Sequence, residues 1–355
     1  IGVFAIQELF HVVKQMELSV SDVDLFTGPV MGRPKSATFR TCDVVGLDTL
    51  IHVANGVKSN CPEDERNRVF QLPDFIVSMK KNNWLGSKSG QGFYKKTIDE
   101  NRKKKILELD LVNLKYKESK KSKYETIAKA KKVEKLSKRI QILFNGEDKA
   151  GEFYRKIFAG IFSYSACRTP EISDDIYSID QAMKAGFGWE MGPFELWDAV
   201  GFQSGLKSIL ASNLIVPDWI KNITDKESFS FYNSNQDGQF FYNHSNTTFD
   251  LIPGFANTIS LNYLSQTNLV WKNKEASIIN LGDGIINVAF HSKMNTIGSE
   301  ILGALNYAID LCEEGNYKGI VIANEGANFS AGANVGIIFM LAMEQEFEEL
   351  ELAVK

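Results

Sequence analysis

The chain has 355 residues, of which 44% are apolar and 24% are charged, and its formal net charge is −4. The length predicts two or three folded units, and the composition is that of an ordinary globular protein rather than a disordered or fibrous one. The small net charge favours neither a nucleic-acid partner nor a membrane surface, and no run of about 18 apolar residues exists that would span a bilayer.

The four cysteines are scattered along the chain, with no C-x-x-C pair and no histidine cluster beside them. This usage is typical of reduced intracellular thiols and predicts no zinc site, so we expect a cytoplasmic protein. No signal peptide is recognisable. The sequence begins at Ile1, inside an apolar helical pattern and without an initiator methionine, which we interpret as an internal portion of a longer protein.

The first element expected is a helix over residues 2–17, where apolar residues recur at helical spacing. Ser19 or Ser21 is suited to cap a second helix, which ends at Gly28. A third helix follows and ends at Gly46. The beginning of the chain is therefore expected to be a helical module.

The segment from residue 101 to residue 139 is strongly basic, with 15 Lys or Arg against 5 Asp or Glu. One interpretation is an arm that binds nucleic acid. We prefer a solvated linker with a surface helix over residues 127–140, because the charges are not interleaved with aromatics in a pattern suited to base stacking.

After this segment the plan of the first part recurs. An apolar helix is expected over residues 151–166, a capped helix over residues 173–186, and a third helix from Pro193 to Gly201. Proline suits the first turn of a helix, where its missing N–H costs nothing. Strand-like alternation is nearly absent from both parts.

The two parts share a motif. Residues 39–46 and residues 194–201 both fit the pattern Phe-x-x-x-Asp-x-x-Gly. The motif aspartates, Asp43 and Asp198, therefore occupy equivalent positions in two similar helices.

The flanks of the motif repeat as well. Asp24 precedes the first motif aspartate by 19 positions, and Asp180 precedes the second by 18. Downstream, residues 90–94 match residues 238–242. We infer that one helical module has been duplicated, and that two copies bury against each other the face that one copy would expose.

The pattern changes near residue 276. Residues 276–281 and 285–290 predict two strands joined by a Gly-Asp-Gly turn, a helix is expected over residues 296–314, and residues 319–324 predict a third strand. This order is typical of the opening of an α/β domain that continues past the end of the chain.

The small-residue segment 329–334 is the best candidate for chemistry. Small residues between a strand and a helix leave backbone N–H groups free, and the helix dipole favours negative charge there. Such a donor stabilises the oxyanion that develops on a thioester carbonyl, by about 3 kcal/mol. The alternative is a plain tight entry into a helix, and the residues alone favour neither.

Three further segments each allow a functional and a structural interpretation. Residues 186–195 are dense in glycines and aromatics, and one interpretation is that they line a ligand cleft. We prefer the interpretation that the glycines permit close helix packing and the aromatics fill a core. Arg33 and Lys35 hold a phosphate or, as we prefer, belong to a solvated loop. Residues 282–287 nearly match G-x-G-x-x-G, but a strand follows, so they predict a hairpin turn and no dinucleotide site.

Several of these stretches resemble known families. Residues 24–48, with G-P-V-M-G-R-P-K-S-A-T-F-R-T-C-D-V-V-G-L-D, resemble the C-terminal domain of 3-hydroxyacyl-CoA dehydrogenases, and residues 85–94 resemble its end. Residues 180–201, with G-F-G-W-E-M-G-P-F-E-L-W-D-A-V-G, resemble a second copy. Residues 276–355, with N-F-S-A-G-A-N, resemble the first part of the enoyl-CoA hydratase (crotonase) fold. The order is similar to that of a multifunctional fatty-acid β-oxidation protein.

The fold class implied is mainly α, with tandem all-α 3-hydroxyacyl-CoA dehydrogenase C-terminal modules followed by a truncated α/β crotonase-like domain. The expected divisions are copy 1 over residues 1–95, a Lys-rich linker over 96–149, copy 2 over 150–250, a connector over 251–275, and the N-terminal part of the crotonase domain over 276–355. Because single-module dehydrogenases of the family pair these domains between subunits, the tandem copies suggest a built-in pseudo-dimer.

The resemblance implies NAD-dependent oxidation of 3-hydroxyacyl-CoA, coupled to hydration of trans-2-enoyl-CoA. It implies that NAD is bound by an upstream domain outside this chain, that an acyl-CoA thioester is the substrate, and that a thiolase or a second copy is the partner, with no nucleic acid and no membrane span.

One site residue carries over from the resemblance. Ala333 matches the position whose backbone N–H enters the oxyanion hole of hydratases, and Asn334 stands where hydratases usually have Asp. The hydratase carboxylates are expected past Lys355, so the isolated chain is expected to be inactive. No cofactor-binding or metal-binding residue is assigned. The alternative is a non-catalytic helical scaffold or a CoA-binding module.

Overall fold

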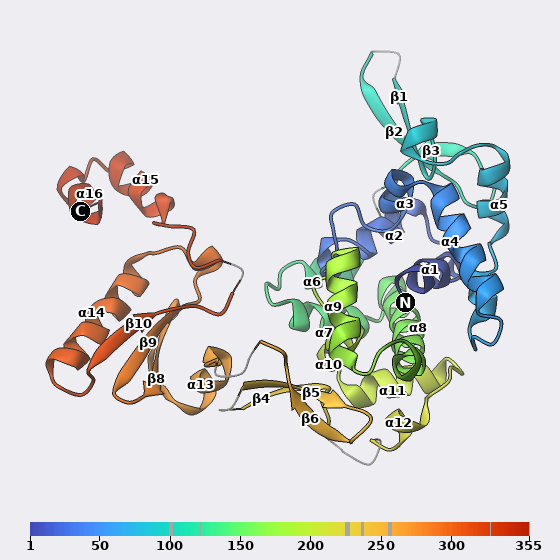
Figure 1. Cartoon of the computed structure of the whole chain (residues 1–355). Helices are drawn as coiled ribbons and strands as arrows, with labels where there is room; N and C mark the ends of the chain where they lie inside the picture. Colours follow the sequence, from blue (N-terminus) through green and yellow to red (C-terminus); the bar gives the residue numbers. More distant parts are fainter. Residues whose placement is uncertain are drawn as a thin grey trace. The chain divides into compact units, whose positions relative to one another are not determined.

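The computed structural model describes residues 1–98, 102–120, 122–223, 228–235, 238–254, 258–326 and 328–354. The chain divides into two compact units (Figure 1). The first comprises residues 1–232 and 241–249, and the second comprises residues 233–240 and 250–355. Helices predominate and the sheets are small, as the sequence predicts. Within the described residues, no helix combines the length and the apolar character needed to cross a bilayer.

The first unit begins with helices joined by short 3₁₀ turns. The helices are α1 (Gly2–Met16), α2 (Val20–Phe26), α3 (Phe39–Val45), α4 (Leu47–Asn60) and α5 (Asp74–Lys81), and the turns are η1 (Pro29–Met31), η2 (Asn67–Phe70) and η3 (Ser87–Ser89). Ser19 caps α2 as predicted, because its side chain accepts a hydrogen bond from the backbone N–H of Asp22.

The basic segment between the two repeats is folded, whereas the sequence predicts a solvated linker. It contains an antiparallel sheet of β1 (Tyr94–Ile98), β2 (Lys104–Leu109) and β3 (Tyr116–Glu118), and two helices, α6 (Glu125–Ala130) and α7 (Leu136–Phe144). The helix predicted over residues 127–140 is thus two helices, and α7 packs against the helices of the second repeat. Its apolar residues Ile140 and Leu143 are fully buried, which outweighs the high density of lysine around them.

The second repeat contains α8 (Lys149–Ile172), α9 (Ile176–Phe187), α10 (Pro193–Val200), α11 (Phe202–Ala211) and α12 (Asp218–Lys221). Helix α8 is longer than predicted, and Asp148 caps it by accepting hydrogen bonds from the N–H groups of Ala150 and Gly151. A three-stranded sheet follows, in the order β4-β5-β6, with β4 (Tyr232–Asn235), β5 (Gly238–Asn243) and β6 (Thr248–Leu251).

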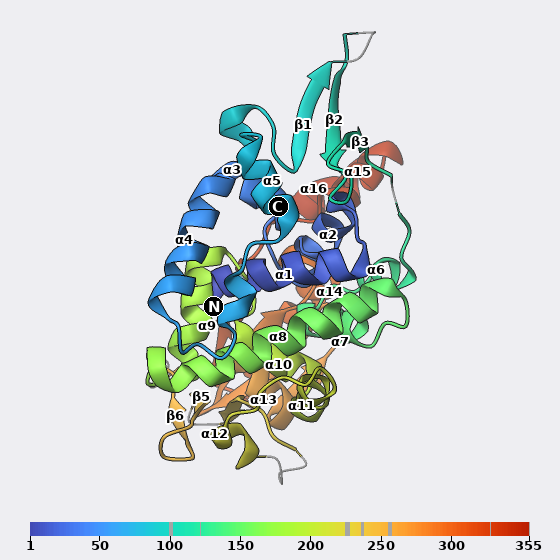
Figure 2. The same ribbon diagram turned by 90° about the vertical axis from the view of Figure 1, so that its right-hand side faces the viewer.

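The two repeats pack against each other through their long helices. Figure 2 shows α1 alongside α8, and the ring of Phe4 on α1 stacks on the ring of Tyr164 on α8 with centroids 3.8 Å apart. The Tyr154 hydroxyl of α8 donates to the carbonyl oxygen of Phe26, at 2.6 Å. The first unit therefore has one core that both repeats share, which agrees with the expected pseudo-dimer.

Aspartate carboxylates hold equivalent helices of the two repeats in place. The Asp24 carboxylate, at the end of α2, accepts hydrogen bonds from the N-terminal N–H groups of α3 and from the Tyr94 hydroxyl, at 2.7, 3.1 and 2.8 Å. The Asp180 carboxylate, on α9, accepts from the N-terminal N–H groups of α10 and from the Tyr232 hydroxyl, each at 2.9 Å. Each carboxylate caps the helix that carries the Phe-Asp motif.

The motif aspartates make the second half of this arrangement. Asp43 accepts hydrogen bonds from the backbone N–H groups of Phe93 and Tyr94, both at 2.8 Å. Asp198 accepts from those of Phe231 and Tyr232, at 2.8 and 2.9 Å. The counterpart of Tyr94 is therefore Tyr232, and the match of residues 90–94 to residues 238–242 is wrong.

The second unit contains the strands and the helix that the sequence predicts. β8 (Ala276–Gly282) and β9 (Ile285–Phe290) are antiparallel, α14 (Ser299–Glu313) follows, and β10 (Gly319–Ile322) pairs in parallel with β9. The predicted connector adds α13 (Leu261–Thr267) and an edge strand, β7 (Leu269–Lys272), so the sheet order is β10-β9-β8-β7. A 3₁₀ turn, η4 (Lys293–Asn295), and two helices, α15 (Val335–Met343) and α16 (Phe347–Val354), complete the unit.

The buried aspartates give the first unit a pH dependence. Burial, aided by the negative charge of Glu195, raises the pKa of Asp180 to about 8, against the effect of its three hydrogen bonds. Burial raises the pKa values of Asp24, Asp43 and Asp198 to about 6. Because the folded state keeps protons that the unfolded chain releases near its ordinary pKa of about 4, the free energy of unfolding falls as the pH rises from about 4 to about 8.

Asp180→Asn removes one titrating group, so we expect the free energy of unfolding of this variant to fall less steeply with rising pH. The difference should be largest between about pH 6 and about pH 8, where the other three aspartates have finished titrating. Urea unfolding across this range, compared with the wild-type chain, measures the difference. Parallel declines in the two proteins would contradict the raised pKa of Asp180.

Candidate functional site

A pocket of about 130 Å³ lies at the N-terminal end of α1, where the two repeats meet. Gly2, Ala5 and Ile6 of α1 form one wall. The remaining walls come from the loop before α3 and from the end of α9 with its following turn, through Arg33, Pro34, Ser36, Ala37, Thr38, Thr41, Phe187 and Trp189. Both repeats therefore contribute to the walls of one pocket.

Arg33 supplies the charge of this pocket. Its guanidinium carbon lies 3.9 Å from the centre of the Trp189 ring, in a cation–π contact between the two repeats. The Gly32 carbonyl next to it accepts a hydrogen bond from the Glu190 N–H, at 2.8 Å. Burial lowers the pKa of Arg33 to about 9, so the guanidinium stays protonated at neutral pH. The preferred interpretation of a solvated loop is wrong for Arg33 and holds for the exposed Lys35.

The ring of Phe187 lies against Gly2. A Cβ atom at Gly2 would be 2.1 Å from the ring, so a larger residue there requires the ring to move. Gly2 and Phe187 also line a neighbouring hollow of about 310 Å³, whose other walls come mainly from α9 and the end of α8. The N-terminus of α1 is thus open to two adjoining hollows, separated by one aromatic side chain.

The glycine-rich segment 186–195 serves both purposes that the sequence leaves open. Phe187 and Trp189 line the pocket, whereas Phe194 is fully buried in the core. Gly192 permits close packing, because a Cβ atom there would be 2.4 Å from the Asp180 backbone, while Gly186 has free space around it.

Ala333 belongs to the second unit. Ile297 forms a parallel bridge with it, in which the Ile297 N–H donates to the Gly332 carbonyl oxygen and the Asn334 N–H donates to the Ile297 carbonyl oxygen, both at 2.9 Å. In this pattern the N–H of Ala333 points away from Ile297. The Asn334 side chain caps α15 by accepting from the Gly336 N–H at 3.1 Å.

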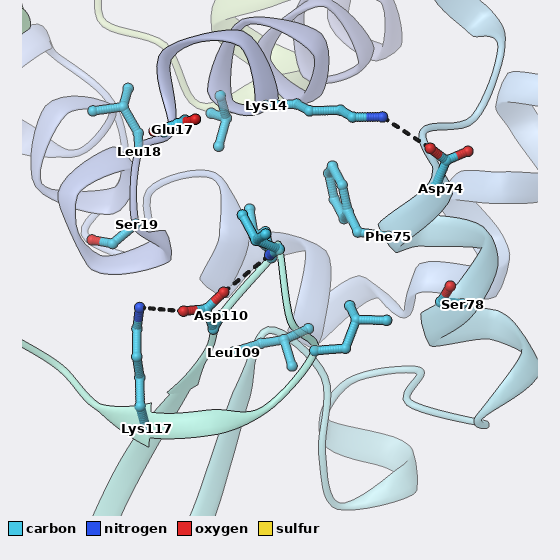
Figure 3. Close-up of a pocket in the computed structure, with 14 residues that line it drawn as sticks. Lys14, Glu17, Leu18, Ser19, Asp74, Phe75, Ser78, Leu109, Asp110 and Lys117 are labelled. Carbon is cyan, nitrogen blue, oxygen red and sulfur yellow. Dashed lines mark hydrogen bonds and ion pairs between the residues drawn. The ribbon is translucent and has the colours of Figure 1, made fainter.

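A larger hollow, of about 480 Å³, lies between the end of α1, the start of α5 and the turn between β2 and β3 (Figure 3). The two lysines that line it form ion pairs: Lys14 Nζ lies 2.9 Å from Asp74 Oδ2, and Lys117 Nζ lies 2.6 Å from Asp110 Oδ2. Because both lysines are paired, neither of them is free to bind a ligand in this hollow.

The segment that nearly matches a dinucleotide-binding motif is not placed as such a motif requires. The near match to G-x-G-x-x-G forms the turn between two antiparallel strands, with φ angles of 98° at Gly282 and 81° at Gly284. A dinucleotide needs these glycines between a strand and a helix N-terminus. The described residues also contain no group of His, Cys, Asp and Glu that would hold a metal ion.

The sequence matches a known domain family over the two repeats. Residues 1–96 and 153–226 match the family "3-hydroxyacyl-CoA dehydrogenase, C-terminal domain". A "Probable 3-hydroxyacyl-CoA dehydrogenase" of Bacillus subtilis is 41% identical over 337 residues, which cover 95% of this chain and 42% of that protein. A "Putative fatty acid oxidation complex trifunctional enzyme" of Rickettsia prowazekii is 23% identical over the whole chain and 45% of its own length. The chain therefore spans less than half the length of these relatives.

The close approach at Gly192 gives a direct test of the repeat packing. Gly192→Ala forces a Cβ atom against the Asp180 backbone, and we expect a loss of about 1–3 kcal/mol in the free energy of unfolding. Gly186→Ala is the matched control, because it adds the same group where space is free and improves helix propensity by up to about 1 kcal/mol. Urea unfolding compares the two variants, and equal effects would show that α9 and α10 do not pack this closely.

Proposed function

We propose that the first unit of this chain is the substrate-side part of an NAD-dependent 3-hydroxyacyl-CoA dehydrogenase of fatty-acid β-oxidation. The premise is that both repeats match the C-terminal domain of 3-hydroxyacyl-CoA dehydrogenases and that the chain is homologous to these enzymes. In this proposal the unit binds the acyl-CoA thioester. NAD is bound by residues outside this chain.

The observation that carries the proposal is the pocket at the N-terminus of α1. Its walls come from both stretches that match the family, and they combine apolar groups such as Ile6 and Phe187 with one buried cation, Arg33. Apolar lining with a few placed polar groups is typical of small-molecule sites.

The lining of the pocket also limits what this chain does. The residues around it include no His, Asp, Glu, Lys or Cys that would act as a general base. The unit therefore binds and orients the acyl group, while the proton and the hydride of the dehydrogenase reaction are handled by groups outside the chain. The shared core of α1 and α8 pairs two C-terminal modules within one chain, as the association of two subunits does in single-module relatives.

The second unit is proposed as the first part of an enoyl-CoA hydratase domain. Two features support this: the parallel β9–β10 pair with α14 between its strands, and the Ala333 N–H, which points away from Ile297 beside the start of α15. A backbone donor in that position would bind the thioester carbonyl oxygen as negative charge develops on it.

The alternative is a helical scaffold that holds CoA esters without turnover. The absence of a base among the pocket residues favours this description for the chain on its own. The two proposals predict different dehydrogenase activities for a longer protein of the length of these relatives.

Turnover of acetoacetyl-CoA with NADH separates the two. We expect no NADH consumption by this chain alone, and consumption by a longer protein that also contains an NAD-binding domain upstream. The binding of acetoacetyl-CoA to the short chain, measured by calorimetry, is the control that it has folded. Binding without turnover by the longer protein would favour the scaffold, and turnover by the short chain alone would show that NAD is bound within it.

A further inference from the structure

Arg33 is left with an unsatisfied charge in the pocket at the N-terminus of α1. Its terminal nitrogen Nη2 is buried and has no hydrogen-bond partner among the described residues. The described residues likewise provide it with no ion pair. Arg33 is half-buried, and a guanidinium whose Nη2 is buried without a counter-charge is costly, since buried charges in proteins are normally paired. The contact with the Trp189 ring offsets only part of this cost.

The surroundings of Arg33 suit an anion. No acidic side chain lines the pocket, so nothing in its walls would repel a negative group. Ser36 and Thr38 bring hydroxyl groups to the wall, and hydroxyls donate hydrogen bonds to carboxylates and phosphates. The Thr41 hydroxyl is already used, because it donates to the Ala37 carbonyl oxygen at 2.6 Å.

The remaining walls suit methylene groups. Ala5, Ile6, Pro34, Ala37 and Phe187 are apolar, and they surround the same space as the charged and hydroxyl groups. The volume of about 130 Å³ lies below the range of about 300–1,000 Å³ that is typical of drug-sized ligand pockets. We therefore expect the pocket to take a short end group, such as a carboxylate with a few methylene groups, and the nucleotide end of CoA to lie outside it.

We propose that this pocket binds a carboxylate at the far end of the acyl chain, so that the unit takes acyl-CoA thioesters of dicarboxylic acids. The inference rests on the proposed function for the thioester and adds the identity of the acyl group. The carboxylate pairs with the Arg33 guanidinium, whose planar fork matches the two carboxylate oxygens. The phosphates of CoA remain in the open, outside the pocket.

The test compares CoA esters of equal acyl length that differ only at the far end. Calorimetry with adipyl-CoA against hexanoyl-CoA, and with the matched C8 and C10 pairs, measures the preference of the wild-type chain. We expect the dicarboxylic ester to bind at least about tenfold more tightly in one or more pairs, the scale of a charge-assisted hydrogen bond.

Two variants assign this preference to Arg33. Arg33→Gln removes the charge and should abolish the preference, because it lowers the affinity for the dicarboxylic ester by at least about tenfold more than the affinity for the neutral ester. Lys35→Gln makes the same change in net charge at an exposed position of the same loop, and it should keep the preference. Circular dichroism and an unchanged urea-unfolding midpoint show that each variant is folded.

Each other result has a distinct meaning. Equal affinities within all wild-type pairs, or a preference that survives Arg33→Gln, would overturn the carboxylate site and leave the acyl-CoA proposal standing. A loss of affinity for CoA itself in Arg33→Gln would show that the guanidinium binds a CoA phosphate and would also overturn the inference. If no CoA ester binds but free adipate binds in an Arg33-dependent way, the anion site stands and the proposed function fails; if neither binds, both fail.

Discussion

The first unit depends on carboxylates that receive backbone N–H groups at the ends of its helices. Asp24 and Asp180 cap α3 and α10, and Asp43 and Asp198, within those helices, hold the chain that follows each repeat. One tyrosine in each repeat links the two carboxylates, since its N–H and its hydroxyl go to different aspartates. These hydrogen bonds join the helices of each repeat to the segment at its end. The groups are buried, where an unpaired N–H or carboxylate would be costly.

The pairing of the repeats creates the pocket that we propose as the acyl-CoA site. Phe4 and Tyr164 bring α1 and α8 together, and the Gly32 carbonyl bonds to the Glu190 N–H. These contacts fix the loop of the first repeat beside the aromatic turn of the second, and the pocket at the N-terminus of α1 lies between them. Neither repeat alone supplies both Arg33 and Trp189, so the binding surface requires the pair.

Part of this structure could be predicted from the sequence. The spacing of Asp24 to Asp43 and of Asp180 to Asp198 revealed the repeat, because each pair must cap one helix and hold the next segment. The counterpart of Tyr94 was misassigned because the local similarity around Tyr242 is strong, whereas the hydrogen bonds of Tyr232 depend on the fold. The folded basic segment was missed because a count of lysines says nothing about the apolar side chains between them. Arg33 could not be placed, since its burial depends on Trp189 in the other repeat.

Hydrogen exchange of the wild-type chain with and without acetoacetyl-CoA tests most directly whether the paired repeats form an acyl-CoA site. The account predicts slower exchange at residues 2–6, 36–41 and 187–189, which come from both repeats and line or adjoin the pocket. Protection confined to one repeat, or found only around the larger hollow near Lys14 and Asp74, would contradict it.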